Sequence, residues 1–260
     1  GRLLRIFGFN LDLCPVLDIS FDDEADNSLR GRCYGNSVEE VVRNAGLFND
    51  ALQQAGVLTC GKHFPGYSRA PLDAHHELPV LPNSREDFEA HELAVFRQFA
   101  KRVDSMMIGH GLYPGLGEGA LCSSLSKRIV GELLREDVGF EGLVLTDDLD
   151  MGAILNHHGL EETIRLAISA GNDMAMICHR VACVEEAFGH LQGLARPHLD
   201  RALANVARFK ARMAPPDPWE EAEFHRRDGE VRQLRADTLG EAFADQLSPE
   251  DGKRSPVEVY

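Results

Sequence analysis

The 260-residue sequence lacks several features that mark common protein classes. It holds six cysteines but no Cys-x-x-Cys pair, and its histidines include no His-Glu-x-x-His segment, so catalysis by a metal or by cysteine redox chemistry is disfavoured. No stretch stays apolar for about 18 residues, so no transmembrane helix is expected. Positive charge is also scarce. The 27 Lys and Arg against 42 Asp and Glu give a net charge of −15, which argues against nucleic acid or an anionic membrane as partner.

The six cysteines are scattered along the chain, and several lie inside apolar runs. This pattern is typical of buried, reduced thiols in a cytoplasmic protein, so a cytoplasmic location is expected. The sequence opens at Gly1 with neither an initiator Met nor a signal-peptide pattern.

Apolar runs alternate with segments of helical periodicity along most of the chain. Five runs predict strands, over residues 10–19, 57–60, 105–110, 142–146 and 173–178. Helices are predicted to begin at Ser37, Ser84 and Ser124, and to cover residues 161–170, 180–194 and 199–213. Strand and helix in regular alternation favour a parallel α/β fold.

Ionisable residues gather where the predicted strands end: Asp18, Lys62 with His63, His110, and Asp147 with Asp148. In a (β/α)8 TIM barrel this edge of the sheet holds the active site. An open doubly wound sheet is the alternative, but no glycine-rich phosphate loop follows any strand. The pattern therefore favours a TIM barrel that is incomplete, with about five of its eight β/α units present.

Composition divides the chain in two. Residues 1–213 are expected to form the partial TIM-barrel catalytic domain. The segment Pro215-Pro216-Asp217-Pro218 ends the last helix of that domain. Residues 214–260 are predicted to form a charged C-terminal tail with one amphipathic helix over residues 231–243.

The most informative stretch runs from Gly61 to Pro82. It contains Lys62-His63-Phe64-Pro65-Gly66 and then Asp73-Ala74-His75. Asp73 and His75 are two residues apart, so on an extended segment they lie on the same side and the carboxylate can hold and charge the imidazole. Asp147 follows a buried strand that would hold it rigidly, although adjacent acids at this place can also serve to cap the next helix.

Two motifs in combination resemble glycoside hydrolase family 3, in its β-N-acetylglucosaminidase branch. They are the Lys62–Gly66 motif with Asp73-x-His75 behind it, and Thr146-Asp147-Asp148-Leu149-x-Met151. The resemblance covers about residues 10–212. It implies a retaining exo-β-N-acetylglucosaminidase with no cofactor and no metal. Its substrates would be small carbohydrates, namely terminal β-linked N-acetylglucosaminides, which in bacterial relatives are muropeptide fragments from peptidoglycan recycling.

The resemblance also implies roles for single residues. Asp147 would be the nucleophile, and His75 the acid/base group with Asp73 as its partner. Lys62, His63 and Arg32 would bind sugar hydroxyls. For His110, two interpretations stay open, a residue that lines the substrate pocket or a histidine whose nitrogens are satisfied in the core.

Two positions depart from the family pattern. Arg32-Cys33-Tyr34-Gly35 stands where the family usually has Arg-Ser-Phe-Gly, and Tyr67-Ser68 stands where it usually has His-Gly. Loss of that glycine is expected to stiffen the loop that delivers His75.

Other functions remain to be weighed. A family 3 β-glucosidase usually has Trp after the nucleophile and lacks the Asp-x-His loop.

Family members begin with about three further β/α units, so this chain is hypothesised to be part of a longer enzyme. A catalytically incomplete fragment or sugar-binding remnant is a further alternative. Because neutral His75 would not repel phosphate, transfer to phosphate is an open side activity. The oligomeric state is not predicted.

Overall fold

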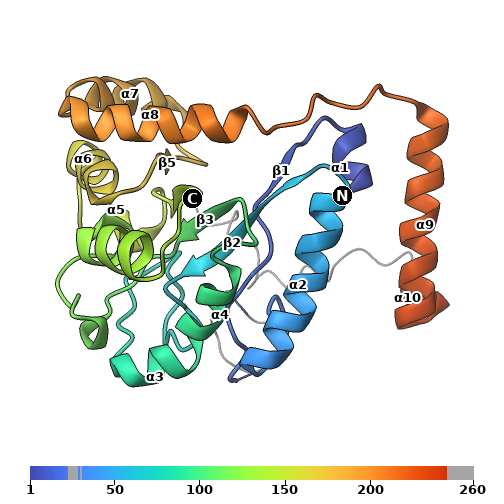
Figure 1. Ribbon diagram of the computed structural model, residues 1–260, viewed down its shortest axis with the longest axis horizontal. Helices are drawn as coiled ribbons and strands as arrows, with labels where there is room; N and C mark the ends of the chain where they lie inside the picture. The colour runs from blue at the N-terminus through green and yellow to red at the C-terminus, as the bar shows by residue number, and fades with distance from the viewer. Residues whose placement is uncertain (23–28, 30, 245–260) are drawn as a thin grey trace.

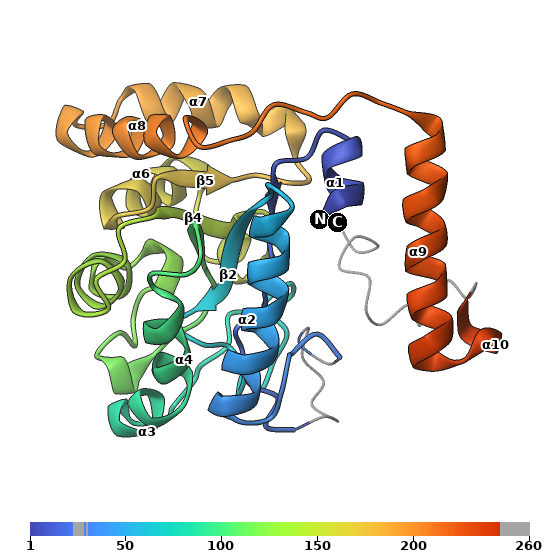
Figure 2. The same cartoon turned by 45° about the vertical axis from the view of Figure 1, so that its right-hand side comes forward.

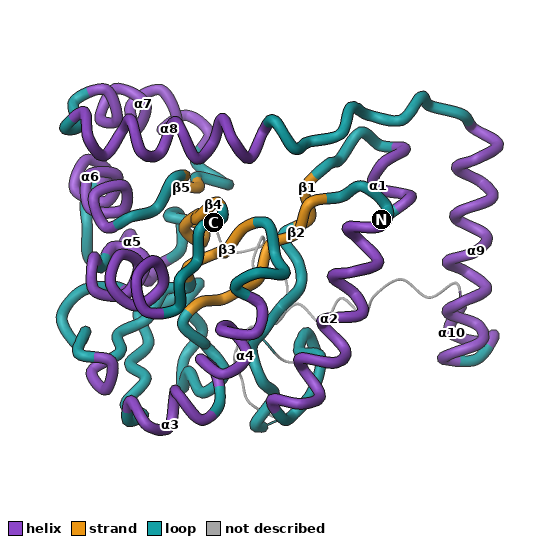
Figure 3. The backbone as a smooth tube through the Cα atoms, in the orientation of Figure 1, coloured by secondary structure: helices purple, strands orange, loops and turns teal. Residues whose placement is uncertain are grey.

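The computed structural model describes residues 1–22, 29 and 31–244, and they form a curled sheet of five parallel strands with helices around it (Figure 1). The strands follow in chain order: β1 (Leu11–Asp12), β2 (Leu58–Phe64), β3 (Ser105–Ile108), β4 (Leu143–Asp148) and β5 (Met174–Met176). The tube view places all five strands at the centre of the fold (Figure 3). The predicted α/β class, an incomplete TIM barrel with about five units, is confirmed.

Each strand pairs in parallel with the next one along the chain. The longest regular register joins β3 to β4, from Ser105 opposite Leu143 to Ile108 opposite Thr146. Within the described residues, β1 and β5 each pair on one side only, so the sheet is open at both edges. Parallel pairing brings the carboxyl ends of all five strands to the same edge.

Helices connect the strands, and several of them cover the convex face of the sheet. They are α1 (Arg2–Ile6), α2 (Val38–Gln54), α3 (Arg85–Ala90), α4 (Glu92–Phe99), the π-type helix η3 (Arg128–Asp137), α5 (Gly152–Leu155), α6 (Leu160–Ala170), α7 (Val184–Gln192) and α8 (Arg196–Lys210). Helix α2 begins as predicted: the Ser37 hydroxyl accepts the Glu40 N–H at 3.3 Å. The chain leaves this helix through Gly56, whose φ is +78°.

Alternating strand residues build two apolar layers. Met106, Ile108 and Val144 face the helices and join the large core of Phe96, Phe99 and Ile129. Their neighbours Met107, Leu143 and Leu145 face the concave side, where Phe209 of α8 packs on them. The convex layer positions the strands, and α8 covers part of the concave face.

Strand limits differ from the prediction at two places. The predicted strand 10–19 is interrupted, because Pro15 has no N–H to donate to a ladder. Strand β2 is longer than the predicted 57–60, and it takes in Lys62 and His63. This extension of β2 forms because its residues pair with β3, and the apolar pattern of the sequence does not reveal that pairing.

Two further expectations are corrected. The helix predicted from Ser84 breaks at His91, between α3 and α4. None of the six cysteines forms a disulfide within the described residues, but only Cys60 and Cys122 are buried, and Cys178 is exposed. No described helix has both the length and the apolar character needed to cross a bilayer.

The C-terminal segment forms a long helix, α9 (Glu221–Leu239), and a short one, α10 (Glu241–Ala244). Helix α9 begins ten residues before the helix predicted over 231–243. It stands away from α8 and beside α1 in both ribbon views (Figures 1 and 2). Phe7 contacts Trp219 with ring centroids 5.6 Å apart, and Arg5 forms an ion pair with Asp217 at 3.0 Å. The segment before β1 therefore contacts the segment that joins α8 to α9.

Candidate active site

Strands β2 and β4 bring His63 and Asp147 together at the carboxyl edge of the sheet. His63 Nε2 lies 3.9 Å from Asp147 Oδ2. This separation is too long for a hydrogen bond. The Asp147 side chain is 20% exposed and that of His63 is 9% exposed. Both groups are thus held by the fold and still reachable from solvent.

Asp18 fixes the orientation of His63 from behind. Its Oδ2 accepts the His63 backbone N–H at 3.0 Å and lies 2.7 Å from His63 Nδ1. A carboxylate oxygen accepts hydrogen bonds, so the Nδ1–H of His63 donates to Asp18, and Nε2 faces Asp147. Asp18 is fully buried. The sequence places Asp18 at a strand end but does not reveal this pairing.

The carboxylate of Asp147 is stabilised by its surroundings. Burial works to raise the pKa of Asp147, but His63, His110 and Lys62, together with the hydrogen bond from the Asp148 N–H, lower it below the usual value. That N–H lies 2.8 Å from Asp147 Oδ1. Asp147 is therefore ionised at neutral pH and directed by the backbone of β4.

The Asp73–His75 pair forms, although by a different route from the one predicted. Asp73 Oδ1 lies 2.6 Å from His75 Nδ1 and accepts the His75 backbone N–H at 3.0 Å. The segment is a turn, closed by N–H groups of His76 and Glu77 on the Asp73 carbonyl, and not an extended strand. Burial works to raise the pKa of Asp73, but the bonds from His75 hold it below the usual value.

The turn that carries His75 is docked on the start of α5. The N–H of Gly152 donates to the His75 carbonyl at 2.9 Å, and that of Ala153 donates to the Ala74 carbonyl at 3.1 Å. A Cβ at Gly152 would lie 2.3 Å from the His76 carbonyl oxygen, so only glycine lets the turn approach this closely. Helix α5, which the sequence did not predict, thereby positions the His75 turn.

Two predicted sugar-binding cations lie near one another. Burial and Asp12 raise the pKa of the Cys14 thiol, while Lys62 and Arg32 both work to lower it. Lys62 is part of β2, and Arg32 is exposed in the loop before α2. Both cations therefore lie close enough to Cys14 to act on its thiol.

His110 is buried, and its contacts favour the core interpretation. Its Nε2 donates to the Asp148 carbonyl at 2.9 Å and its Nδ1 lies 2.9 Å from Ser124 Oγ. Burial works to lower the pKa of His110, but the Cys122 thiol and Asp147 raise it above the usual value. Both ring nitrogens of His110 are thus hydrogen-bonded within the protein, and Nε2 binds the backbone next to Asp147. Direct sugar binding by His110 stays a prediction.

A second group at this edge was not singled out by the sequence. Asp148, Asp150 and His179 place potential metal ligands within 4.8 Å of one another. These atoms already bond within the protein: His179 Nδ1 lies 2.7 Å from Asp148 Oδ2, and the Arg180 guanidinium lies 2.7 Å from Asp150 Oδ1. We interpret the group as a network that holds the end of β5 beside Asp147. The position of His179, directly after the predicted strand 173–178, was an available signal.

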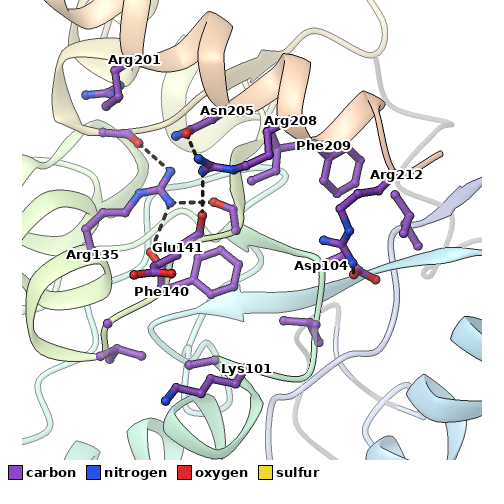
Figure 4. Close-up of a pocket in the computed structure, with 18 of the residues that line it drawn as sticks. Lys101, Asp104, Arg135, Phe140, Glu141, Arg201, Asn205, Arg208, Phe209 and Arg212 are labelled. Carbon is purple, nitrogen blue, oxygen red and sulfur yellow. Dashed lines mark hydrogen bonds and ion pairs between the residues drawn. The ribbon is translucent and has the colours of Figure 1, made fainter.

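A large hollow lies at the opposite edge of the sheet, where the strands begin (Figure 4). It measures about 1830 Å³ and contains none of the predicted site residues. Figure 4 shows Arg135, Arg201, Arg208 and Arg212 around it. These arginines bond to backbone carbonyls and acidic side chains. The arginines around the hollow are therefore engaged within the fold, and the predicted site residues lie at the other edge.

Comparisons with known proteins identify the family of this chain. The family model described as "Glycosyl hydrolase family 3 N terminal domain" matches residues 2–209. The chain is 29% identical over 234 residues to a beta-hexosaminidase of Bordetella parapertussis, and 33% identical over 195 residues to one of Tolumonas auensis. These alignments cover 90% and 74% of this chain, but 64% and 56% of the relatives' lengths.

A solved structure extends the likeness to three dimensions. The glycoside hydrolase family 3 β-N-acetylglucosaminidase of Paenibacillus sp. str. FPU-7 superposes with a TM-score of 0.78 at 30% identity. The match covers 90% of this chain and 48% of that protein. The chain thus spans between about half and two thirds of the length of the proteins that it resembles.

Proposed function

Because the chain belongs to glycosyl hydrolase family 3, we propose that it carries the catalytic groups of a retaining exo-β-N-acetylglucosaminidase. The substrate would be a terminal β-linked N-acetylglucosaminide, such as a fragment derived from the bacterial cell wall. The observation that carries this proposal is the combination of an ionised Asp147 at the end of β4 with an Asp73–His75 pair on a turn docked at the same edge.

Asp147 would attack the anomeric carbon and form a glycosyl ester. A retaining mechanism needs such a nucleophile on one face of the sugar and a proton donor on the other. The lowered pKa of Asp147 keeps the attacking oxygen ionised, and its bond to the Asp148 N–H leaves Oδ2 as the oxygen nearer to His63. The 3.9 Å between His63 and Asp147 gives room for a sugar hydroxyl that bonds to His63.

His75 would supply the proton that most retaining glycosidases obtain from a second carboxylic acid. As an imidazolium, it protonates the leaving oxygen while the C–O bond breaks. The neutral imidazole then takes a proton from water, which attacks the ester and releases the sugar and free Asp147. The Asp73 carboxylate would stabilise the cation and orient the ring, because it bonds to Nδ1, and proton transfer is assigned to Nε2.

Release of nitrophenol from an aryl β-N-acetylglucosaminide tests the proposal, with Asp147→Asn as the variant. We expect Asp147→Asn to lose on the order of 10⁴-fold or more in turnover, because the nucleophile is removed. Because the chain spans only part of its relatives' length, the assay is run on the 260-residue chain and on the same chain extended by the amino-terminal β/α units of a relative. Equal turnover by Asp147→Asn and the unaltered protein would contradict the proposal.

A β-glucoside in the same assay separates the alternative of a β-glucosidase. We expect preference for the N-acetylglucosaminide, since the chain carries the Asp73-x-His75 loop. Covalent capture completes the test: a slowly hydrolysed fluorosugar should label the peptide that contains Asp147. Label on a different peptide would refute the assignment of the nucleophile.

A further inference from the structure

Tyr67 lies at the beginning of the loop that carries Asp73 and His75, and its side chain is almost fully buried. Its O–H donates to the Leu72 carbonyl at 2.6 Å, and its oxygen accepts the Ala74 N–H at 2.7 Å. These two partners flank Asp73 in the sequence. One hydroxyl group therefore holds the backbone on both sides of the carboxylate that binds His75.

The hydroxyl is suited to both bonds at once. Burial raises the pKa of Tyr67 far above its ordinary value, so the phenol keeps its proton and remains both donor and acceptor. The sequence pattern of the family has His at this place. An imidazole is shorter and carries its donor and acceptor on two separate atoms, so it does not offer both bonds from one point.

The backbone of Tyr67 is tied to the other half of the site. Its N–H donates to Asp18 Oδ1 at 2.6 Å, and the second oxygen of the same carboxylate holds His63. The next residue is also fixed, because Ser68 Oγ accepts the Ile19 N–H at 2.8 Å. A chain of bonds thus runs from His63, which faces Asp147, through Asp18 and Tyr67 to the Asp73 turn.

We infer that Tyr67 is a positioning residue that fixes the Asp73–His75 pair relative to His63 and Asp147. The hydrogen bonds of Tyr67 by themselves support its role in anchoring the loop. The consequence for proton transfer rests on the proposed function, in which His75 is the acid/base group. Two measurements therefore test the two parts separately. One tests whether Tyr67 anchors the loop, and the other tests whether this anchoring affects proton transfer by His75.

The first readout is amide hydrogen exchange in the 260-residue chain, with Tyr67→Phe compared with Tyr113→Phe. Tyr113 is a matched control, because it is also fully buried and its hydroxyl donates to a backbone carbonyl, that of Gly66, at 3.1 Å. We expect the Ala74 amide to exchange about three- to tenfold faster in Tyr67→Phe, the effect of losing one buried hydrogen bond. Tyr113→Phe should leave that amide unchanged. An unchanged rate in Tyr67→Phe, or equal acceleration in both variants, would overturn the anchor.

The second readout is leaving-group dependence, measured on whichever form of the protein hydrolyses the aryl substrate. Tyr67→Phe should lower kcat for an alkyl N-acetylglucosaminide several-fold more than for the nitrophenyl one, with KM little changed, because only the alkyl leaving group needs the proton. Tyr113→Phe should scale both rates equally.

A faster Ala74 exchange without this kcat split refutes the positioning role and leaves the proposed function standing. If no form hydrolyses either substrate, the proposed function fails, and the exchange rate alone decides whether Tyr67 holds the loop.

Discussion

The two edges of the parallel sheet both gather charged side chains, but they use them in opposite ways. Where the strands begin, the arginines around the large hollow bond to carbonyls and acidic side chains, as Arg135 does with Asp173 at 2.6 Å. Where the strands end, Asp147 and His75 keep 20% and 17% of their side chains exposed. The carboxyl edge is therefore the candidate reactive edge, because its ionisable groups are oriented and exposed, whereas the arginines around the hollow are engaged in bonds within the fold.

Two buried carboxylates sharpen this contrast. Asp173, at the beginning of β5, accepts bonds from Arg135, the Val144 N–H and Asn205. Glu92, in α4, lies directly behind Gly66 of the catalytic loop, and neither of its carboxylate oxygens has a hydrogen-bond partner within the described residues. The carboxylate of Asp173 is therefore held by several hydrogen bonds, whereas that of Glu92 has the Arg69 guanidinium at 3.7 Å as its charge partner.

The largest effect is expected at the reactive edge. His75→Ala should lower turnover of alkyl N-acetylglucosaminides by about 10²–10⁴-fold, because general acid catalysis is lost, and should affect activated aryl substrates far less. Steady-state kinetics across leaving groups of rising basicity measures this. His76→Ala is the control, because His76 is the exposed neighbour. Equal losses for all leaving groups would count against the acid role of His75.

Next in size is a stability effect at the other edge. Asp173→Ala should destabilise the fold by about 3–5 kcal/mol, because it leaves the Arg135 cation and a buried N–H without their partner. Denaturant unfolding measures the free energy. Asp200→Ala is the control, because Asp200 makes an exposed pair with Arg196 and should change stability by less than about 1 kcal/mol. A similar small change for Asp173→Ala would show that this edge does not support the fold.

A pH-dependent gain is expected from Glu92→Gln. Burial raises the pKa of Glu92 from 4.5 to about 7, so the native protein loses stability as pH rises between those values. Below pH 4.5 the acid is protonated in both states and the substitution should be neutral. Above pH 7 it should stabilise by about 2–3 kcal/mol. Unfolding curves at pH 4 and pH 8 measure the difference, and an equal effect at both would contradict the assignment.

The smallest effect is expected for the exposed lysines of the large hollow. Lys101→Ala and Lys127→Ala should each change stability by less than about 0.5 kcal/mol and leave turnover unaltered, since the hollow is not the reactive site. Thermal unfolding and the aryl assay measure both. A several-fold loss of turnover in either variant would mean that the two edges are functionally coupled.

Much of the fold follows from local sequence. The apolar runs, the Ser37 cap and Gly56 fix the order of strands and helices, because each acts over a few residues. The extension of β2 through Lys62 and His63 depends on pairing with β3, more than 40 residues away, and no local pattern reports it. Helix α9 was missed in its first ten residues for a similar reason: Trp219, just before the helix, and Phe224, in its first turns, pack on Phe7, which directly follows α1.

The site divides in the same way. Asp147, His63 and the Asp73–His75 pair were predicted from motifs that are contiguous or nearly so. The partners that orient them come from elsewhere: Asp18 is 45 residues from His63, and His179 is 31 residues from Asp148. Such pairs are visible only when the strands are side by side. The roles of the site residues and the cytoplasmic location stay predictions.

The absence of a side chain at Gly152 has a consequence for protein engineering. A mutational library selected for activity should tolerate almost nothing at this position, although it contributes no reactive atom. The loop of residues 61–82 also cannot be transferred by itself, because the backbone on which it docks, at the start of α5, lies about 70 residues later in the sequence. A graft of this loop into a related barrel should work only when the start of α5 is transplanted with it. One methyl group added at the position of Gly152 should prevent the grafted loop from docking.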